Sequence, residues 1–428
     1  MRRTTHGTGR RRWCDFQNYH KTACPAGCCF RTGRLTTLRQ ASHSHVLLEK
    51  PMPHHFARPR WVLFVAASLA ACGAFAASVA ASAATASPAT LVVVRESQQM
   101  PWNAVALDGR GRFIVSAPRW TGNTGPAVAI AQNHGALVPY PAAGWNSWTP
   151  GSAAARAFVS VNAIHQDARG DLWIVDTGTP AFGGTPVADG AKVVHIDPRT
   201  DRVVRVYIFP KEVIRDHSYV DDIRIQGGHA YLTDAGEGAV IVLDLDSGRA
   251  RRRFDGAAFA RARANDRIIV NGKVLTGNDG KPLQVNADPL ELSPDGRTLY
   301  FGPLTGPLSQ IETRYLDDDG IDDAALAQQV RPWFDNPPIG GTAMGADGSL
   351  YYTPLADNTL MRRAPDGTVS TIAHDRDLRW ADAPYLDGQG HVYLPVAQID
   401  GAPAFNQGTS TIRFPVKLYR VDLPAGQR

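Results

Sequence analysis

The segment from Asp171 to Asp246 contains two similar units of β-type sequence. It opens with Asp171-Leu-Trp-Ile-Val-Asp-Thr-Gly178 and, after further apolar runs and polar turns, starts again with Ala230-Tyr-Leu-Thr-Asp-Ala-Gly236. Each half is a β-type apolar run that ends in Asp-x-Gly, followed by a second run, a polar turn and a third run. Strand units that recur with the same turn chemistry indicate a repeat architecture, and a four-stranded unit at this spacing is typical of a propeller blade.

Aligning the chain on the first strand of this unit and its Asp-Gly-like turn gives six copies. They begin at Asn103, Asn162, Asp221, Asp288, Thr342 and Asp382. The intervals of 59, 59, 67, 54 and 40 residues suit one blade each. The run Leu91–Glu96 is a spare strand, which we expect to complete the last blade beside the C-terminal run Lys417–Asp422. The sequence therefore predicts an all-β, six-bladed β-propeller over residues 91–428, closed by this N-terminal strand, with a helix at Asp322–Val330.

Composition supports this class and excludes others. The chain is rich in Gly (40) and Pro (30), and few stretches show helical periodicity. Residues 1–72 hold 12 Lys and Arg against 2 Asp and Glu, so the remainder, with 33 basic and 38 acidic residues, is net acidic. No nucleic-acid partner is expected for such a body. All five cysteines precede residue 73, which leaves the propeller without disulfides or thiolate metal sites.

The N-terminal region has the pattern of an export signal. Residues 52–87 have a short basic segment, an apolar run and an Ala/Ser tail, the pattern of a signal peptide. Residues 1–51 are therefore expected to be a non-native or mis-annotated extension. Three processing routes stay open: cleavage after Ala81-Ser-Ala83, lipidation of Cys72 in a lipobox-like Leu69-Ala-Ala-Cys72-Gly73, or retention of the apolar run as an anchor. Each predicts a secreted or periplasmic protein that touches the membrane only through its N-terminus.

The six residues that begin the copies share one register position on the strand that lines the channel, and all six carry oxygen. Carboxylates and amides that converge on one axis suit Ca²⁺ or another divalent cation, which takes 6–8 oxygen ligands. We take Asn162, Asp221 and Asp288 as candidate metal ligands. The alternative is that Asp and Asn at strand starts only cap turns.

Further candidates surround this ring. Asn103, Thr342 and Asp382 are expected to bind a small-molecule ligand, with Trp102 and Trp380 as stacking surfaces beside them. His217, on the loop before Asp221, is a candidate general base, and Asp288 is the other candidate catalytic residue.

Other residues near the ring are given structural roles. His165 and Arg224 follow ring members by three residues, which predicts that they lie on the opposite strand face, or come near only through twist. Asp176 and Asp234 are interpreted as turn residues. No motif for nucleotide, flavin or zinc-protease chemistry occurs, so no such cofactor is expected.

Several motifs together resemble the major royal jelly/Yellow family in its bacterial branch. They are Ser116-Ala-Pro-Arg-Trp120, Val138-Pro-Tyr-Pro141, Asp171–Gly178, Tyr231–Gly236 with Gly238–Asp244, Ser293–Phe301 and Leu378-Arg-Trp-Ala-Asp382. The resemblance covers residues 91–422 and implies a secreted six-bladed propeller. Members of the family include carriers that hold small amines in the channel and pigment-pathway proteins linked with dopachrome conversion.

The chain is more distantly similar to the regucalcin/gluconolactonase and paraoxonase propellers, which hydrolyse lactones with a channel Ca²⁺ held by Glu, Asn and Asp. Asn162, Asp221 and Asp288 match the Asn and Asp parts, whereas Asn103 stands where those lactonases tend to have Glu. Three functions stay open: a binder of a small polar ligand, an enzyme of the lactonase or dopachrome-isomerase type, and a protein-interaction platform.

Overall fold

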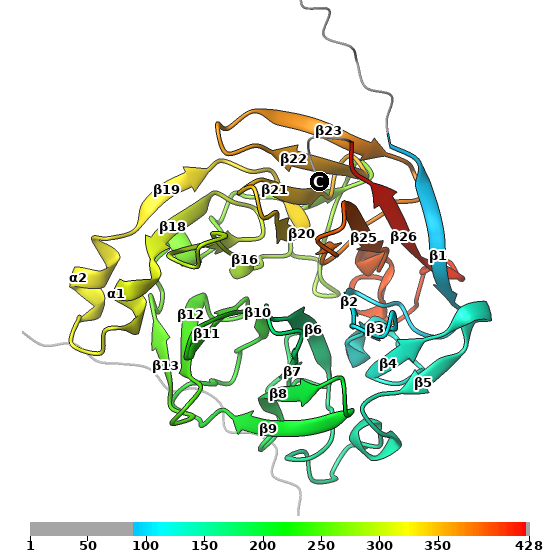
Figure 1. Ribbon diagram of the computed structural model, residues 1–428, viewed down its shortest axis with the longest axis horizontal. Coiled ribbons are helices and arrows are strands. Elements are labelled where there is room, and N and C mark those ends of the chain that lie inside the picture. Colours follow the sequence, from blue (N-terminus) through cyan, green and yellow to red (C-terminus); the bar gives the residue numbers. More distant parts are fainter. Residues whose placement is uncertain (1–88, 425–428) are drawn as a thin grey trace, which may run out of the picture. The chain divides into compact units, whose positions relative to one another are not determined.

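The computed structural model describes residues 89–424. Within these residues, six four-stranded antiparallel sheets stand around a central axis as the blades of a propeller (Figure 1). The predicted all-β, six-bladed fold is therefore confirmed. The predictions made for residues 1–88, including the signal segment and Cys72, lie outside the described residues.

In the first five blades the strands follow sequence order from the channel outward. Blade 1 consists of β2 (Ala104–Leu107), β3 (Phe113–Ser116), β4 (Val128–Ala131) and β5 (Leu137–Pro139). Blade 2 consists of β6 (Val161–Gln166), β7 (Leu172–Thr177), β8 (Ala191–Asp197) and β9 (Arg202–Ile208). Blade 3 consists of β10 (Val220–Gln226), β11 (His229–Asp234), β12 (Ala239–Asp244) and β13 (Ala250–Arg253). Blade 4 consists of β16 (Ala287–Leu292), β17 (Thr298–Pro303), β18 (Leu308–Glu312) and β19 (Arg331–Phe334), and blade 5 of β20 (Ile339–Met344), β21 (Leu350–Pro354), β22 (Thr359–Arg363) and β23 (Val369–His374).

Blade 6 joins the two ends of the described chain. It consists of β24 (Tyr385–Leu386), β25 (His391–Pro395), β26 (Val416–Asp422) and β1 (Leu91–Ser97). β1 pairs antiparallel with β26, from Leu91 opposite Val421 to Ser97 opposite Val416. The predicted closure by the N-terminal strand is confirmed, and it joins the first and last elements of the ring as such closure does in other propellers.

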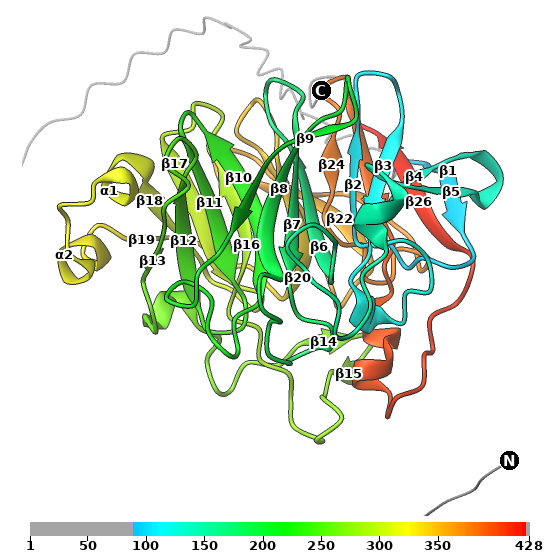
Figure 2. The ribbon, with the colours of Figure 1, turned by 90° about the horizontal axis from the view of Figure 1, so that it is seen from below.

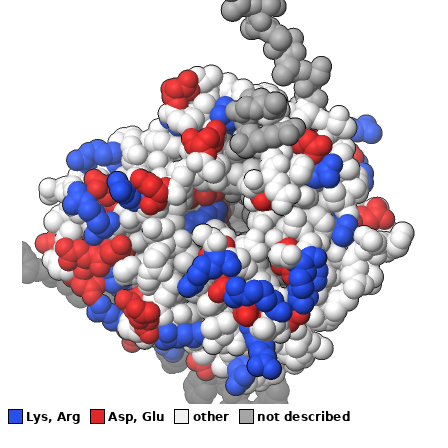
Figure 3. Space-filling model, viewed as in Figure 1, with Lys and Arg blue, Asp and Glu red and all other residues white. Residues whose placement is uncertain are grey.

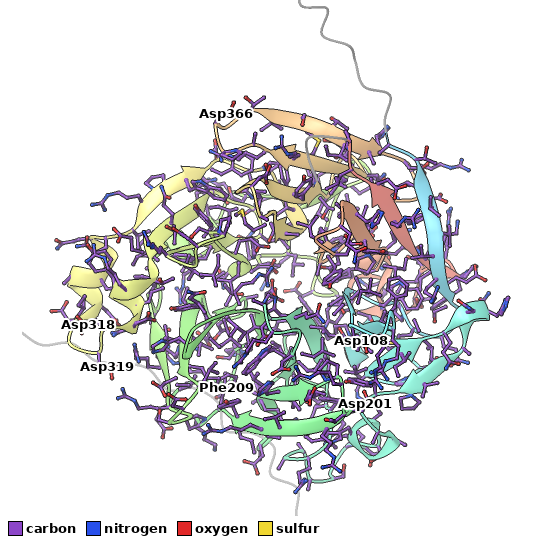
Figure 4. The ribbon with its side chains drawn as sticks, viewed as in Figure 1. Asp108, Asp201, Phe209, Asp318, Asp319 and Asp366 are labelled. Carbon is purple, nitrogen blue, oxygen red and sulfur yellow. The ribbon has the colours of Figure 1, made fainter. Side chains whose placement is uncertain are left out.

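The hydrophobic core is divided into wedges between neighbouring blades. Large, fully buried aromatic side chains fill these wedges, among them Trp173 between blades 2 and 3 and Tyr231 between blades 3 and 4. Ion pairs seal the junctions nearer the surface. Arg112 joins Asp108 of blade 1 to Asp201 of blade 2, with N–O distances of 2.7 Å to both carboxylates (Figure 4).

The hairpins between first and second strands owe their tightness to the Asp-Gly chemistry seen in the sequence. Asp108 Oδ1 accepts hydrogen bonds from the backbone N–H groups of Arg110 and Arg112. In blades 4 and 5, Gly296 and Gly348 adopt φ of 70° and 82°, values that a glycine adopts without steric cost.

Long loops gather on one side of the sheets, the lower side of Figure 2, which we call the loop face. It carries the small hairpin of β14 (Ile269–Val270) and β15 (Lys273–Val274), and the 3₁₀ helices η5 (Ile399–Gly401) and η6 (Pro403–Phe405). The other 3₁₀ helices are η1 (Arg119–Thr121), η2 (Asn133–Gly135), η3 (Ala143–Asn146) and η4 (Ala258–Ala260). These loops position the site described below.

Two short α-helices lie between β18 and β19. They are α1 (Thr313–Asp317) and α2 (Asp323–Ala327). The helix predicted at Asp322–Val330 is present but shorter, with Asp322 as its N-cap, and α1 was not predicted. In the described part of the chain, no helix has the length and apolarity needed to cross a membrane.

Candidate functional site

The six residues of the ring meet in the channel. All of them line one small cavity of about 30 Å³ near its middle. In blades 2 to 5 the first strand carries one extra residue relative to its partner at this point, for example between Val220 and Ile223 in blade 3. Such β-bulges re-aim side chains and are frequent beside active sites. The bulges explain why polar residues at strand starts point inward rather than only capping turns.

Hydrogen bonds run around the ring from blade to blade. Asn103 Nδ2 donates to the backbone carbonyl of Asn162 at 2.8 Å, and Asn162 Nδ2 donates to Asp221 Oδ1 at 2.7 Å. The orientation of the Asn162 amide follows from its neighbours. The indole N–H of Trp120 donates to Tyr219 Oη (2.9 Å), so the Tyr219 hydroxyl proton is free to donate to Asn162 Oδ1 (2.8 Å). Asn162 therefore presents its amino group, not its oxygen, to Asp221.

Three carboxyl groups of the ring are desolvated and repel one another. Burial raises the pKa of Asp221 well above its ordinary value, and the charge of Asp288 raises it further. Burial and the charge of Asp382 do the same to the pKa of Asp288, which also shares a hydrogen bond with Asp221. The pKa of Asp382 is raised by burial and by Asp221. Among residues 89–424, no Lys, Arg or His forms an ion pair with any of the three.

Two further ring oxygens lack partners. Asn103 Oδ1 and Thr342 Oγ1 form no hydrogen bond, and both are buried, since the two residues are only 3% and 4% exposed. Buried polar atoms are nearly always satisfied, and an orphan costs about 1–3 kcal/mol. Together with the unpaired carboxylates, these atoms make the ring a site with an excess of acceptors.

A larger cavity of about 260 Å³ opens from the ring to the loop face. Its lining contains the ring residues Asn162, Asp221, Asp288 and Asp382, together with aromatic side chains from the loops. Phe182 packs edge-on against both Trp120 and Phe405, with ring centroids 4.9 Å apart in each pair. The three rings are half-buried and partly face the cavity.

The predicted site residues outside the ring divide into two groups. His217 is exposed and lines the larger cavity at the loop face, and Trp380 lines it as well. The indole of Trp380 donates to Asp382, and its backbone φ of 48° is rare for a bulky residue. Trp102 does not line the cavity. It is fully buried between blades 1 and 6, where its indole donates to the carbonyl of Lys417 at 3.2 Å, so the stacking role expected for it is corrected to a core role.

A second group of charged residues lies on the inner strands of blades 3 and 4. Arg224 pairs with Glu291 (2.7 Å) and with Asp222 (2.8 Å), and its nearby charge adds to burial in lowering the pKa of His165 to about 3. His165 and Arg224 thus lie near each other on the inner strands of blades 2 and 3, where a bulge in each strand shifts the side-chain alternation by one residue. The opposite face, shown in Figure 3, is hollowed at its centre, with basic and acidic side chains in the hollow.

Asp176 and Asp234 hold loops, as predicted, but also carry ion pairs. Asp176 accepts from the backbone of Val159 and pairs with Lys192 at 2.6 Å, both side chains being fully buried. Asp234 accepts from the backbone of Tyr219 and pairs with Arg252 at 2.7 Å. Their charges are neutralised, in contrast with those of the ring.

Comparison with known proteins now places the chain. Residues 159–378, just over half of it, match the family model described as major royal jelly protein. The chain belongs to the major royal jelly protein family. The matched region contains four of the six ring residues, and the resemblance noted in the sequence is confirmed.

Relatives found by sequence agree with this family. Protein yellow of Drosophila erecta is 26% identical over 223 residues, which are 49% of this chain and 40% of that protein, and protein yellow of Drosophila melanogaster matches with the same identity and coverage. The alignment thus spans well under two thirds of these relatives.

Among structures, virginiamycin B lyase from Staphylococcus aureus aligns with TM-score 0.44 and 12% identity over 78% of this chain and 99% of that one. A gluconolactonase from Xanthomonas campestris aligns with TM-score 0.44 and 13% identity over 79% and 95%. At this level the alignments carry no argument, and the propeller assignment rests on the sheets themselves.

A divalent cation was expected at Asn162, Asp221 and Asp288. Within the described residues, no three His, Cys, Asp or Glu side chains are grouped closely enough to hold a metal. Asn162 Oδ1 is engaged by Tyr219, which leaves it poorly placed as a ligand. The oxygens with free lone pairs are instead those of Asn103 and Thr342, beside the carboxylates. Oxygen donors of this kind suit a hard cation, and Asn103 and Thr342 would replace the predicted Asn162 as its neutral ligands.

The residues that sequence reasoning missed lie in loops. Tyr219, Trp120, Phe182 and Phe405 come from four separate segments, and none has the periodicity or turn chemistry that exposed the ring. The one available signal was Tyr219, two residues before the ring member Asp221, which could have been inspected together with His217.

Proposed function

We propose that this propeller is a binding protein for a small, positively charged, polar ligand that enters the channel from the loop face. The observation that carries the proposal is the set of three desolvated carboxyl groups, Asp221, Asp288 and Asp382, which have no cationic partner in the described chain. Clustered carboxyl groups raise one another's pKa because each resists ionisation beside the others, and a bound cation removes that cost. Natural proteins tolerate such a cluster where function requires it.

The walls of the larger cavity support a ligand with an apolar body. Aromatic faces attract cations and also bury flat apolar groups, with cation–π contacts worth about 0.5–2 kcal/mol. Trp120, Phe182 and Phe405 provide such faces above the carboxylates, and the volume of about 260 Å³ suits a molecule of modest size.

A divalent cation such as Ca²⁺ is the second candidate occupant of the ring, favoured by the orphaned oxygens of Asn103 and Thr342. It would be held by these two side chains with the carboxylates of Asp221 and Asp288, which share a hydrogen bond. A bound divalent cation would polarise a carbonyl oxygen and lower the pKa of a water molecule. The exposed His217 at the loop face would then be the residue that moves a proton in a lactonase-type hydrolysis.

Export belongs to the same proposal. The signal-peptide pattern of residues 52–87 supports a secreted or periplasmic protein, with Cys72 as the lipidation point if the lipobox is used. Edman sequencing or intact mass of the protein recovered from its host tests this, since the three processing routes leave different N-termini.

A calorimetric titration tests the binding proposal. The probe is 2-phenylethylammonium, which joins an ammonium group to an aromatic ring, and 2-phenylethanol is its neutral counterpart. We expect the cation to bind and the alcohol to bind at least about tenfold more weakly, since a lost charge-assisted contact costs about 1.5–3 kcal/mol. Equal binding of both would show that the carboxylates do not select charge. Ca²⁺ is titrated separately into chelator-treated protein.

A further inference from the structure

A second concave site lies on blade 6, behind the wall of the channel. The loop 396–415 between β25 and β26 contributes Ile399 and Phe405 to the larger channel cavity. The same loop contributes Gln398 and Arg413 to a separate cavity of about 260 Å³. We call this second cavity the basic groove, and its charged and aromatic lining consists of Arg376, Arg379, Arg413, Lys417, Phe414 and Tyr419, with Asp377.

The charges of the basic groove do not balance. Arg379 is neutralised by a bidentate pair with Asp400, its Nη2 donating to Oδ2 at 2.6 Å and its Nε to Oδ1 at 3.0 Å. Lys417 is neutralised by Asp377 at 3.2 Å. Arg413 forms no side-chain ion pair or hydrogen bond within the described residues, and the guanidinium of Arg376, 95% exposed, approaches Asp377 only to 3.9 Å.

Two arginines of the basic groove therefore remain available on a propeller that is otherwise net acidic. Arginine presents several N–H donors in a planar fork that matches the oxygens of phosphate and carboxylate groups.

A buried glutamine holds one wall of the groove in place. Gln398 is 8% exposed, and its side-chain amide brackets the backbone of Arg413, donating to its carbonyl and accepting from its N–H, both at 2.9 Å. Gln398 adopts φ of 50°, and Trp380, next to Arg379, adopts φ of 48°. Left-handed backbone at residues other than glycine costs energy and concentrates at functional sites.

These two strained residues also join the groove to the channel. The backbone N–H of Ala397 donates to the carbonyl of Trp380 at 3.1 Å, so the segments 379–380 and 397–399 form one wall. One side of this wall carries Trp380 and Ile399 toward the channel cavity, and the other carries Arg379 and Gln398 toward the groove.

From these observations we infer that the basic groove is a binding site for a small oxyanion, a phosphate- or carboxylate-bearing molecule, held by Arg376 and Arg413 beside the paired Arg379 and Lys417. The ring of Phe414, which is 41% exposed, offers an apolar surface to the remainder of such a molecule. The site is independent of the channel proposal, because it rests on none of the ring residues.

The test uses inorganic phosphate and succinate as probes, titrated calorimetrically at constant ionic strength maintained with chloride. We expect saturable binding of at least one probe, and the stronger of the two identifies the source of the oxyanion. The double variant R376Q/R413Q should bind about tenfold or more weakly, the loss expected when charge-assisted hydrogen bonds are removed. The matched control R156Q/R331Q removes two exposed arginines that lie outside the groove and should bind as the parent does.

Several outcomes would overturn the inference. They are the absence of saturable binding for both probes, equal weakening in both double variants, or binding that chloride alone reproduces, since each shows a general charge effect. The D288N variant should leave phosphate and succinate binding unchanged, and a loss there would place the anion in the channel instead. Thermal unfolding of each variant without probe shows that the parent fold is kept.

Discussion

The substitution Asp288→Asn should make the ligand-free protein more stable at neutral pH. Asp288 shares a hydrogen bond with Asp221, and neither has a cationic partner in the described chain. Two unit charges about 4 Å apart repel by about 4 kcal/mol at the effective dielectric of a protein site. Because a shared proton relieves part of this repulsion, we expect a gain of about 1–3 kcal/mol. The introduced amide can donate to Asp221 and so keeps the contact.

Differential scanning calorimetry measures the effect, and a second buried aspartate provides the matched control. About 1–3 kcal/mol corresponds to a rise in Tm of about 2–6 °C for a domain of this size. Asp176→Asn makes the same chemical change beside Lys192, where both side chains are fully buried and paired at 2.6 Å. Removing one partner of a buried pair costs about 3–5 kcal/mol, so this variant should melt lower.

The stability gained by Asp288→Asn should depend on pH in a defined direction. The pKa of Asp288 is raised in the folded state, so the folded protein binds a proton more tightly than the unfolded chain does. The free energy of unfolding of the wild type therefore rises as pH falls and this group takes up its proton. The extra stability of Asp288→Asn over the wild type should shrink from its value at neutral pH toward zero near pH 4, about the pKa of an unfolded Asp. The reasoning is refuted if Asp288→Asn lowers Tm as Asp176→Asn does, or if its gain does not depend on pH.

Three further predictions follow from the same structure. Tyr219→Phe removes the hydroxyl that orients Asn162, so chemical denaturation should show a free energy of unfolding lower by about 1 kcal/mol. Calorimetric titration should also show weaker binding of the cation in the channel. Unchanged binding would contradict the orienting role. The pKa of His165 is lowered to about 3 in the folded protein, so the stability of the wild type should fall as pH falls below about 6.5. His165→Gln should make this decline shallower in melting curves recorded at acid pH. A parallel decline in both proteins would contradict the role given to His165. Deleting residues 89–97 removes β1 and exposes the edge of β26, so the Tm should drop. Light scattering should show that molecules associate through the exposed edge. A monomer with an unchanged Tm would contradict the role given to β1 in closing the ring.

Most of the fold could be read from the sequence because propeller blades repeat their local chemistry. The Asp-Gly turns, the apolar second strands and the spare run at Leu91–Glu96 each have a local cause, and together they specify six blades and their closure. Loops lack such a repeat. The lengths of α1 and α2, and the packing of residues 396–415 over the channel, depend on contacts between distant segments.

The ring was predictable in membership but not in geometry. Its register position placed six oxygen-bearing residues together, yet strict alternation does not place the residues that follow them, such as His165 and Arg224. One extra residue in each of four inner strands reverses the alternation, and nothing in the composition of those strands marks it. Trp102 was misassigned for a related reason, since adjacency in sequence to Asn103 says little about which side of a strand faces the channel.

The measurement that bears most directly on the central claim is a calorimetric titration of 2-phenylethylammonium, and separately of Ca²⁺, into the wild type and the Asp288→Asn variant at neutral pH. The unpaired carboxylates predict saturable binding of at least one of these cations by the wild type. They also predict a loss of about tenfold or more in the variant, even though the variant melts higher. If neither cation binds the wild type, or if the variant binds as tightly as the wild type, the ring is not a cation-binding site.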